Sequence, residues 1–299
     1  MTEGAAPRPD APIGVFDSGV GGLTVLAALR ARLPGECFLY LGDTARLPYG
    51  TKSGETVARY ALQATDVLVA RGVKALVVAC NTASSVALPA ITARHPGLPV
   101  TGVVEPGAQA ACEATRRGHV AVLATEGTIR GGAYQRAIAR LRPETRVEGV
   151  ACPMFVALAE EGWNEGSIAE AVARRYLDPL FGATGGSPPP PDVLVLGCTH
   201  FPLLLAPIRA AIGAGVRIVD SAATTAATVE DQLTRDGMLA SRGTAPGSRF
   251  LATDGRDRFA RVGSAFLGVQ IDPADVELVD LPAPPAAPAG EARPQAGRA

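Results

Sequence analysis

The sequence carries one phrase twice, LVVACNTAS at residues 76–84 and LVLGCTHFP at residues 194–202. Each phrase is an apolar run that ends in a small residue, a cysteine and two polar residues. A short apolar run followed by a polar turn and a helix is typical of a parallel strand, whose carboxyl end is the ligand-binding edge of an open α/β sheet. We therefore expect Cys80 and Cys198 to lie at two such edges and to act as a pair. The unpaired N–H groups of the following helices are expected to lower the thiol pKa values.

Strands and helices alternate on both sides of these phrases. IGVFDSGVGGLTVLAALRARL begins at residue 13 and CFLYLGD at residue 37, and a second series of strand–helix units begins after Pro99. This alternation predicts two similar doubly wound parallel-sheet α/β domains with the active site between them.

The domain limits follow from where the second series begins and ends. We assign residues 12–98 and 221–270 to the first domain and residues 99–220 to the second. Three remaining segments are rich in Pro, Ala or Gly and lack apolar periodicity, which favours disorder at the termini and an exposed loop inside the chain. They are residues 1–11, 282–299 and the Pro-rich segment 182–191.

Composition excludes several classes of protein. Lys and Arg number 28 against 29 Asp and Glu, so no net charge favours nucleic acid or an anionic membrane, and we expect a small-molecule substrate. No apolar stretch reaches the roughly 20 residues of a membrane span, and the first residues do not resemble a secretory signal. A cytoplasmic protein is expected. The five cysteines contain no C-x-x-C and the histidines number three, which argues against disulfides and a metal site.

Two short motifs stay open on residue evidence alone. GVGG after Asp17 is either a phosphate cradle or a tight turn in which Asp17 caps the next helix. Pro48, Tyr49 and Gly50 have the composition of an ordinary turn as well as a position beside the predicted site.

Two opposed cysteines suit the inversion of a carbon centre. One thiolate removes a proton from one face of a weakly acidic carbon, and one thiol returns a proton to the other face, without a cofactor. The other usual solution, a pyridoxal Schiff base, needs a lysine in the site. Only two lysines exist: Lys74 precedes its strand and so lies at the wrong end of the sheet, and Lys52 has no supporting motif.

The motifs together resemble the glutamate racemase family. The similarity is carried by FDSGVGGLTVL, YLGDTARLPYG, VVACNTAS, VLATEGTIRG, CPMFVALAEEG and LVLGCTHFP, in this order over residues 13–222. The resemblance implies a cofactor-independent isomerase that interconverts L-glutamate and D-glutamate and supplies D-glutamate for peptidoglycan, and we expect a homodimer.

The resemblance also implies roles for residues of this sequence. Cys80 would take the α-proton from D-glutamate and Cys198 from L-glutamate, with Asp17 and His200 assisting. Glu160 matches a carboxylate near the family's site. The implied substrate-binding residues are Asp17, Ser18, Tyr49, Gly50, Asn81, Thr82, Thr199 and His200. Hydroxyls, an amide and helix N-termini bind carboxylates without an arginine, which leaves Asp17 for the substrate ammonium or a thiol.

Three alternatives stay open. An aspartate racemase would share the chemistry. A cysteine hydrolase or amidotransferase would use Cys198 with His200 as base, although residues two apart on a turn need not face each other and Cys80 would be idle. A module that binds an amino acid without reacting would use the same pocket.

Overall fold

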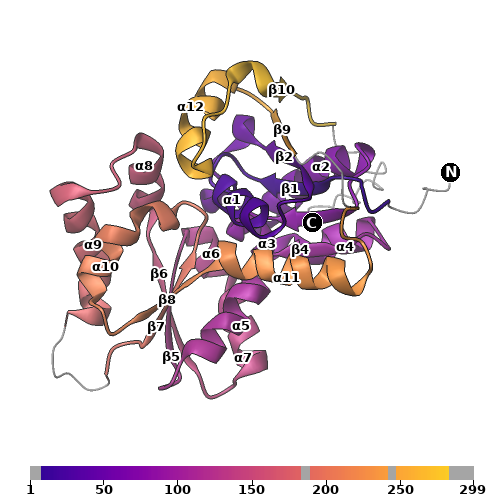
Figure 1. The fold of residues 1–299 in the computed structure, drawn as a ribbon. Coiled ribbons are helices and arrows are strands. Elements are labelled where there is room, and N and C mark those ends of the chain that lie inside the picture. The colour runs from indigo at the N-terminus through magenta and orange to yellow at the C-terminus, as the bar shows by residue number, and fades with distance from the viewer. Residues whose placement is uncertain (1–7, 183–188, 242–246, 283–299) are drawn as a thin grey trace, which may run out of the picture.

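The computed structural model describes residues 8–182, 189–241 and 247–282, and within them the strands form two parallel sheets (Figure 1). The first sheet has the order β10-β9-β2-β1-β3-β4, with β1 Ile13–Asp17, β2 Cys37–Gly42, β3 Ala75–Val78, β4 Val100–Gly102, β9 Gly247–Ala252 and β10 Val276–Leu278. The second has the order β6-β5-β7-β8, with β5 His119–Ala124, β6 Arg146–Ala151, β7 Val193–Gly197 and β8 Arg217–Asp220. The two predicted α/β units are confirmed.

Helices cover both faces of the first sheet, because alternate residues of its buried strands point to opposite sides. Ile13 and Val15 pack in the core that includes α1 (Leu23–Arg32), α11 (Ser221–Arg235) and α12 (Arg256–Leu267). Phe16 belongs to the opposite core, with α2 (Gly54–Ala70), α3 (Asn81–Val86) and α4 (Leu88–Arg94).

The second sheet is covered in the same way. Leu194 and Leu196 of β7 pack in a core that includes α8 (Pro153–Glu161), α9 (Gly166–Phe181) and α10 (Leu205–Ile212). Val193 and Val195 face α5 (Val104–Ala114) and α7 (Ala133–Leu141), while α6 (Glu126–Gly131) follows β5. In the described part of the chain no helix is both long enough and apolar enough to cross a bilayer.

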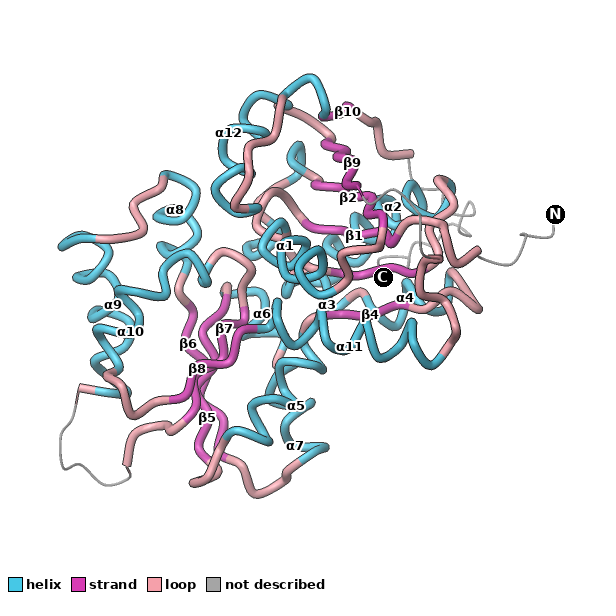
Figure 2. The backbone as a smooth tube through the Cα atoms, viewed as in Figure 1, coloured by secondary structure: helices cyan, strands magenta, loops and turns pink. Residues whose placement is uncertain are grey.

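Strand pairing moves two of the expected domain limits. The strand after Pro99, expected to open the second domain, is β4, and Leu76 of β3 pairs with Val100 in the first sheet. The first sheet also continues past residue 270, because β10 pairs with β9. The tube in Figure 2 shows both additions at the edges of the first sheet. We therefore propose that the second domain begins after β4 and ends between β8 and α11.

The expected disorder lies partly outside the described residues, which leave out 1–7, 183–188 and 283–299. The described end of the N-terminal segment is held in place. The backbone carbonyl of Pro9 accepts a hydrogen bond from Lys74 Nζ, and Asp10 Oδ1 accepts one from Ser241 N at 3.0 Å. Residues 8–11 thus differ from the prediction because they close the amino end of the first sheet.

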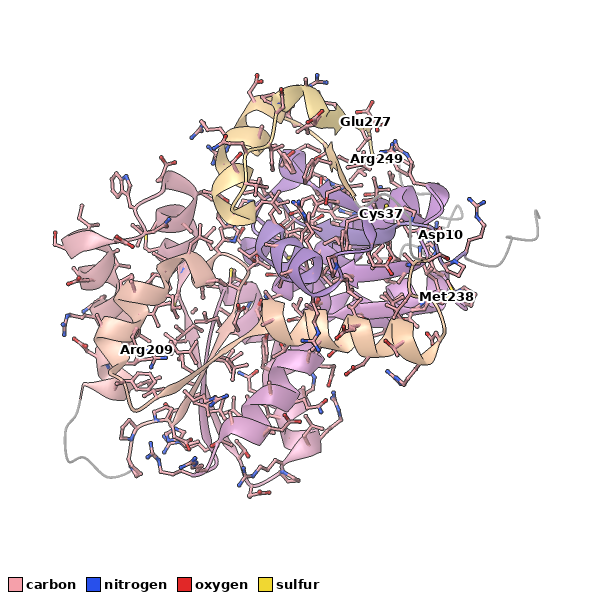
Figure 3. The ribbon with its side chains drawn as sticks, viewed as in Figure 1. Asp10, Cys37, Arg209, Met238, Arg249 and Glu277 are labelled. Carbon is pink, nitrogen blue, oxygen red and sulfur yellow. The ribbon has the colours of Figure 1, made fainter. Side chains whose placement is uncertain are left out.

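A buried ion pair anchors this end. Lys74, immediately before β3, is fully buried, and its Nζ lies 2.6 Å from Glu36 Oε2. The same Nζ donates to the carbonyl of Met238 at 2.8 Å, and Figure 3 labels Met238 and Asp10 at this anchor. Lys74 therefore lies at the end of the sheet opposite the cysteines, as its position before the strand indicated.

Replacement of Lys74 by Met should lower the free energy of unfolding by about 3–5 kcal/mol, because Glu36 would stay buried without its counter-charge. Urea unfolding at neutral pH measures this loss. The matched control is Arg71→Met, which removes the partly exposed pair with Glu277, 2.7 Å between Nη2 and Oε1, labelled at Glu277 in Figure 3. That change should cost under about 1 kcal/mol. Equal losses in the two variants would contradict the role given to Lys74.

Candidate active site

The two cysteines lie in the wall of one cavity. Cys80 follows β3 and is the N-cap residue of α3, and Cys198 follows β7 directly. Each is buried to 6% exposure, and both line a cavity of about 330 Å³. Residues of both sheets surround this cavity at the carboxyl ends of their strands, so the predicted pairing of the two phrases is found in the structure.

Cys80 sits in an environment that keeps its thiol protonated. Ala83 N donates to Cys80 Sγ at 3.5 Å, as expected at a helix start. The pKa of Cys80 is nevertheless raised to about 12: burial and, next, the charge of Asp17 raise it, and the hydrogen bonds from Ser18 and Ala83 oppose these effects without reversing them. The prediction of a lowered pKa is therefore wrong for Cys80, because desolvation of a buried thiolate outweighs one helix N-terminus.

Asp17 is buried next to the cavity but does not line it. It ends β1, next to β3 in the sheet, is 1% exposed and is not among the residues that line the cavity. Its Oδ2 accepts a hydrogen bond from Gly19 N at 2.9 Å, and the backbone of Gly22, the N-cap residue of α1, also hydrogen-bonds its carboxylate, so Asp17 holds the turn that leads into α1. Burial raises the pKa of the Asp17 carboxyl, with the positive charge of His200 opposing.

The GVGG turn brings the two domains into contact. A Cβ added at Gly21 would overlap His200 and Thr199 of the second domain. Thr24 Oγ1 donates to the carbonyl of Thr199 at 3.0 Å across the same contact. The glycines thus serve a tight turn and a close approach of backbone to side chain, and the phosphate-cradle reading finds no support here.

Cys198 faces a positively charged relay. His200 Nδ1 lies 3.8 Å from Cys198 Sγ, and His200 Nε2 lies 3.1 Å from Glu160 Oε1. Burial acts against the charged imidazole, but the hydrogen bonds to Cys198 and Glu160 prevail and raise the pKa of His200 to about 10. The raised pKa favours the charged imidazole, whose Nδ1 lies between Cys198 Sγ and Thr199 Oγ1, 3.4 Å from the latter.

Asn81 has an unpaired amide donor in the wall of the cavity. It is 3% exposed, lines the cavity, and its Oδ1 accepts a hydrogen bond from Tyr134 OH at 2.8 Å. Its buried Nδ2 has no partner among the described residues. A buried amide donor of this kind costs stability unless a ligand satisfies it, and a substrate carboxylate is the matching acceptor.

The other predicted binding residues also line the cavity: Ser18, Tyr49, Gly50, Thr82, Thr199 and His200, with Glu160 beside them. Thr82 Oγ1 lies 3.0 Å from Thr125 Oγ1 of the second domain. The Tyr49 hydroxyl donates to buried Asp43, so Tyr49 is held as part of the wall rather than free to hydrogen-bond a ligand.

Comparison with known proteins assigns the family. The family model described as Asp/Glu/Hydantoin racemase matches residues 23–229. This chain belongs to that racemase family. A glutamate racemase of Geobacter metallireducens is 49% identical over 271 residues, which cover 91% of this chain and 97% of that protein.

Solved structures of racemases from this family share the fold. A glutamate racemase isoform from Bacillus anthracis is 37% identical with a TM-score of 0.85, covering 92% of this chain and 99% of that one. The Francisella tularensis glutamate racemase, solved with D-glutamate, is 34% identical with a TM-score of 0.83, covering 91% and 98%.

Sequence reasoning missed three residues of this racemase site. Thr125 follows β5, whose Ala124 pairs with Gly197 just before Cys198, so its place after a strand was an available signal. Asp43 accepts hydrogen bonds from Tyr49, Arg46 and Thr253 and fixes the loop that carries Tyr49. Tyr134 lies within α7, away from any strand end, and no pattern pointed to it.

His200 should stay doubly protonated at about pH 8, because its hydrogen bonds outweigh the effect of burial. Nitrogen-15 NMR of the imidazoles checks this, with His95 as internal control, since burial lowers the pKa of His95. The raised pKa also means that His200 stabilises the fold fully below about pH 6.5, its unfolded value, and that this contribution is lost as pH rises through about 10. A neutral His200 at about pH 8 would contradict the relay.

Asn81→Ala should raise the KM for the amino-acid substrate about 10- to 100-fold, because a hydrogen bond to a charged group contributes roughly 1.5–3 kcal/mol. Tyr134→Phe should produce a smaller rise, since the amide stays but loses its fixed orientation. Tyr176→Phe is the matched control, because that hydroxyl accepts from Met154 N at 3.2 Å and does not line the cavity. Steady-state kinetics measure all three, and an unchanged KM in Asn81→Ala would remove Asn81 from substrate binding.

Proposed function

We propose that this protein interconverts L-glutamate and D-glutamate by proton transfer between its two cysteines and the α-carbon. One observation carries the proposal: Cys80 and Cys198, from opposite domains, line one cavity, and Asn81 in its wall has an amide nitrogen without a partner among the described residues. Family membership and relatives named glutamate racemase support the substrate. The product D-glutamate is a building block of peptidoglycan.

The proposed reaction balances with two protein protons. From L-glutamate, the Cys198 thiolate takes the α-proton, so the C–H bond breaks, its electron pair stays on the α-carbon, and an S–H bond forms. The Cys80 thiol then gives its proton to the opposite face, which yields D-glutamate with Cys80 as thiolate and Cys198 as thiol. This second form of the enzyme is the one that takes up D-glutamate, and the same steps run in reverse.

Each cysteine has its own support in this scheme. The raised pKa of Cys80 suits a residue that waits as an acid, and its thiolate, once formed, is buried beside Asp17. The imidazolium of His200 provides an N–H and a positive charge at Cys198, which stabilise a negative sulfur by hydrogen bonding and Coulomb attraction. Asp17 therefore acts through Cys80 in our proposal, and we do not assign it to the substrate ammonium, because it does not line the cavity.

The substrate carboxylates are proposed to bind to neutral donors. Among the described residues no Lys or Arg lines the cavity, whereas hydroxyls and the starts of helices do. The hydroxyl donors are Ser18, Thr82, Thr125 and Thr199. Together with the Asn81 amide and the N–H groups of the α3 and α6 termini, they match two carboxylates without an opposing cation.

One contact favours the hydrolase alternative, but a hydrolase explains less of the site than a racemase does. Cys198 and His200 do face each other at 3.8 Å, so their spacing on the turn is no objection to a thiolate–imidazolium pair. Cys80 and the family assignment still have no place in a hydrolase. Aspartate racemisation shares every step, so only assay with both amino acids separates the two substrates.

Assembly and location are also part of the proposal. We infer a cytoplasmic homodimer. Three large apolar side chains near α8 and α9, Met154, Trp163 and Ile168, are more than half exposed, which favours contact with another protein surface. Sedimentation equilibrium of the purified protein tests the dimer.

The decisive experiment follows circular dichroism of the purified protein with L-glutamate, D-glutamate, L-aspartate and D-aspartate in turn, in the presence of a chelator and without added pyridoxal phosphate. Cys80→Ala and Cys198→Ala should each lower glutamate racemisation at least about 10³-fold. In deuterium oxide the wild type should form the opposite enantiomer with deuterium at the α-carbon. Cys152→Ala, in the buried core beside Cys198, is the matched control. Near wild-type turnover by Cys80→Ala would refute the two-thiol proposal.

A further inference from the structure

Glu160 joins two cations that come from different domains. Its Oε1 lies 3.1 Å from His200 Nε2, and its Oε2 lies 2.8 Å from Arg258 Nη2. Glu160 and His200 belong to the second domain, whereas Arg258 lies in the first turn of α12, which packs against α1 of the first domain. Figure 1 shows α12 and α8 on facing sides of the two domains.

Glu160 is otherwise poorly restrained. Its side chain is 17% exposed, and among the described residues its carboxylate forms one other hydrogen bond, to His200. Arg258 itself is about half exposed and does not line the catalytic cavity. Arg258 therefore cannot touch a substrate in that cavity, but it fixes the carboxylate plane that meets His200.

The same helix contacts the relay a second time. The ring of Phe266, in the last turns of α12, packs edge-on against His200 with centroids 5.0 Å apart. The imidazole is thus bounded by Cys198 and Glu160 through hydrogen bonds and by α12 through Phe266. A shift of α12 would loosen His200 from two sides, whereas loss of Arg258 alone would loosen only Glu160.

We propose that Arg258 is a positioning residue for the proton transfer at Cys198, acting through Glu160 and His200. The inference rests on the proposed racemase function and adds a residue outside the catalytic cavity to it. The hydrogen bonds that start at Arg258 end at Cys198, whereas Cys80 is reached only through the charge of His200 on Asp17 and through Cys198 itself. Loss of Arg258 should consequently impair the proton transfer at Cys198 more than the transfer at Cys80.

Rates alone do not reveal which transfer is impaired. The enantiomers of glutamate have equal free energies, so kcat/KM must fall by the same factor in both directions for any variant. Isotope effects do separate the steps. If only the transfer at Cys198 is slowed, C–H cleavage becomes more rate-limiting for the enantiomer that Cys198 deprotonates, and less rate-limiting for the enantiomer that Cys80 deprotonates.

The test measures kcat/KM for α-deuterated and unlabelled L-glutamate and D-glutamate with wild type and Arg258→Gln. We expect kcat/KM to fall roughly 10- to 100-fold, since small misplacements in an active site carry losses of this size. The deuterium effect should rise for L-glutamate and fall for D-glutamate relative to wild type. The reverse pattern would support the same role for Arg258 and assign Cys198 to D-glutamate instead.

Two further variants make the result specific. Arg258→Lys keeps a cation opposite Glu160 and should restore part of the rate and move both isotope effects back toward wild type. Arg261→Gln removes an exposed charge from the same helix that forms no ion pair with the described residues, and it should change neither the rate nor the isotope effects. Isotope effects unchanged for both enantiomers, or an unchanged rate, in Arg258→Gln would overturn the proposal. An inactive wild type would instead overturn the racemase function.

Discussion

The site depends on how closely the two domains approach at Gly21. A side chain there would overlap Thr199 and His200, so the first domain can reach the second only with a bare backbone at this point. The approach buries Asp17 against the charge of His200 and lets Thr24 hydrogen-bond the carbonyl of Thr199. Because each sheet contributes one cysteine, the catalytic pair exists only while this contact holds.

The two similar sequence motifs place their cysteines in different environments. Cys80 is surrounded by apolar packing and a buried carboxyl, and desolvation dominates its titration. Cys198 lies beside His200, and the hydrogen bond from His200 to Glu160 of α8 favours the charged imidazole. In the proposed reaction one cysteine is the acid and the other the base at any moment, and the two exchange these roles when the direction of the reaction changes.

Periodicity and strand ends predicted the βα units and the pairing of the cysteines, because these features follow from local sequence. The resemblance to the family supplied most of the predicted cavity wall. Other features depend on distant packing. The three-residue strand β4 joins the first sheet only through its pairing with β3, and the direction of the Cys80 pKa depends on how much packing surrounds the sulfur. Tyr134 hydrogen-bonds Asn81 from the other domain, 53 residues away in the sequence, and no local pattern could predict that contact.

The burial of Cys80 bears on chemical durability as well as on catalysis. Oxidants and alkylating reagents attack the thiolate, and a thiol with a pKa of about 12 is almost entirely neutral at physiological pH. With 6% of its surface exposed, Cys80 is also hard for such reagents to reach. The environment that disfavours the Cys80 thiolate thus also helps to keep Cys80 reduced until a substrate enters the cavity.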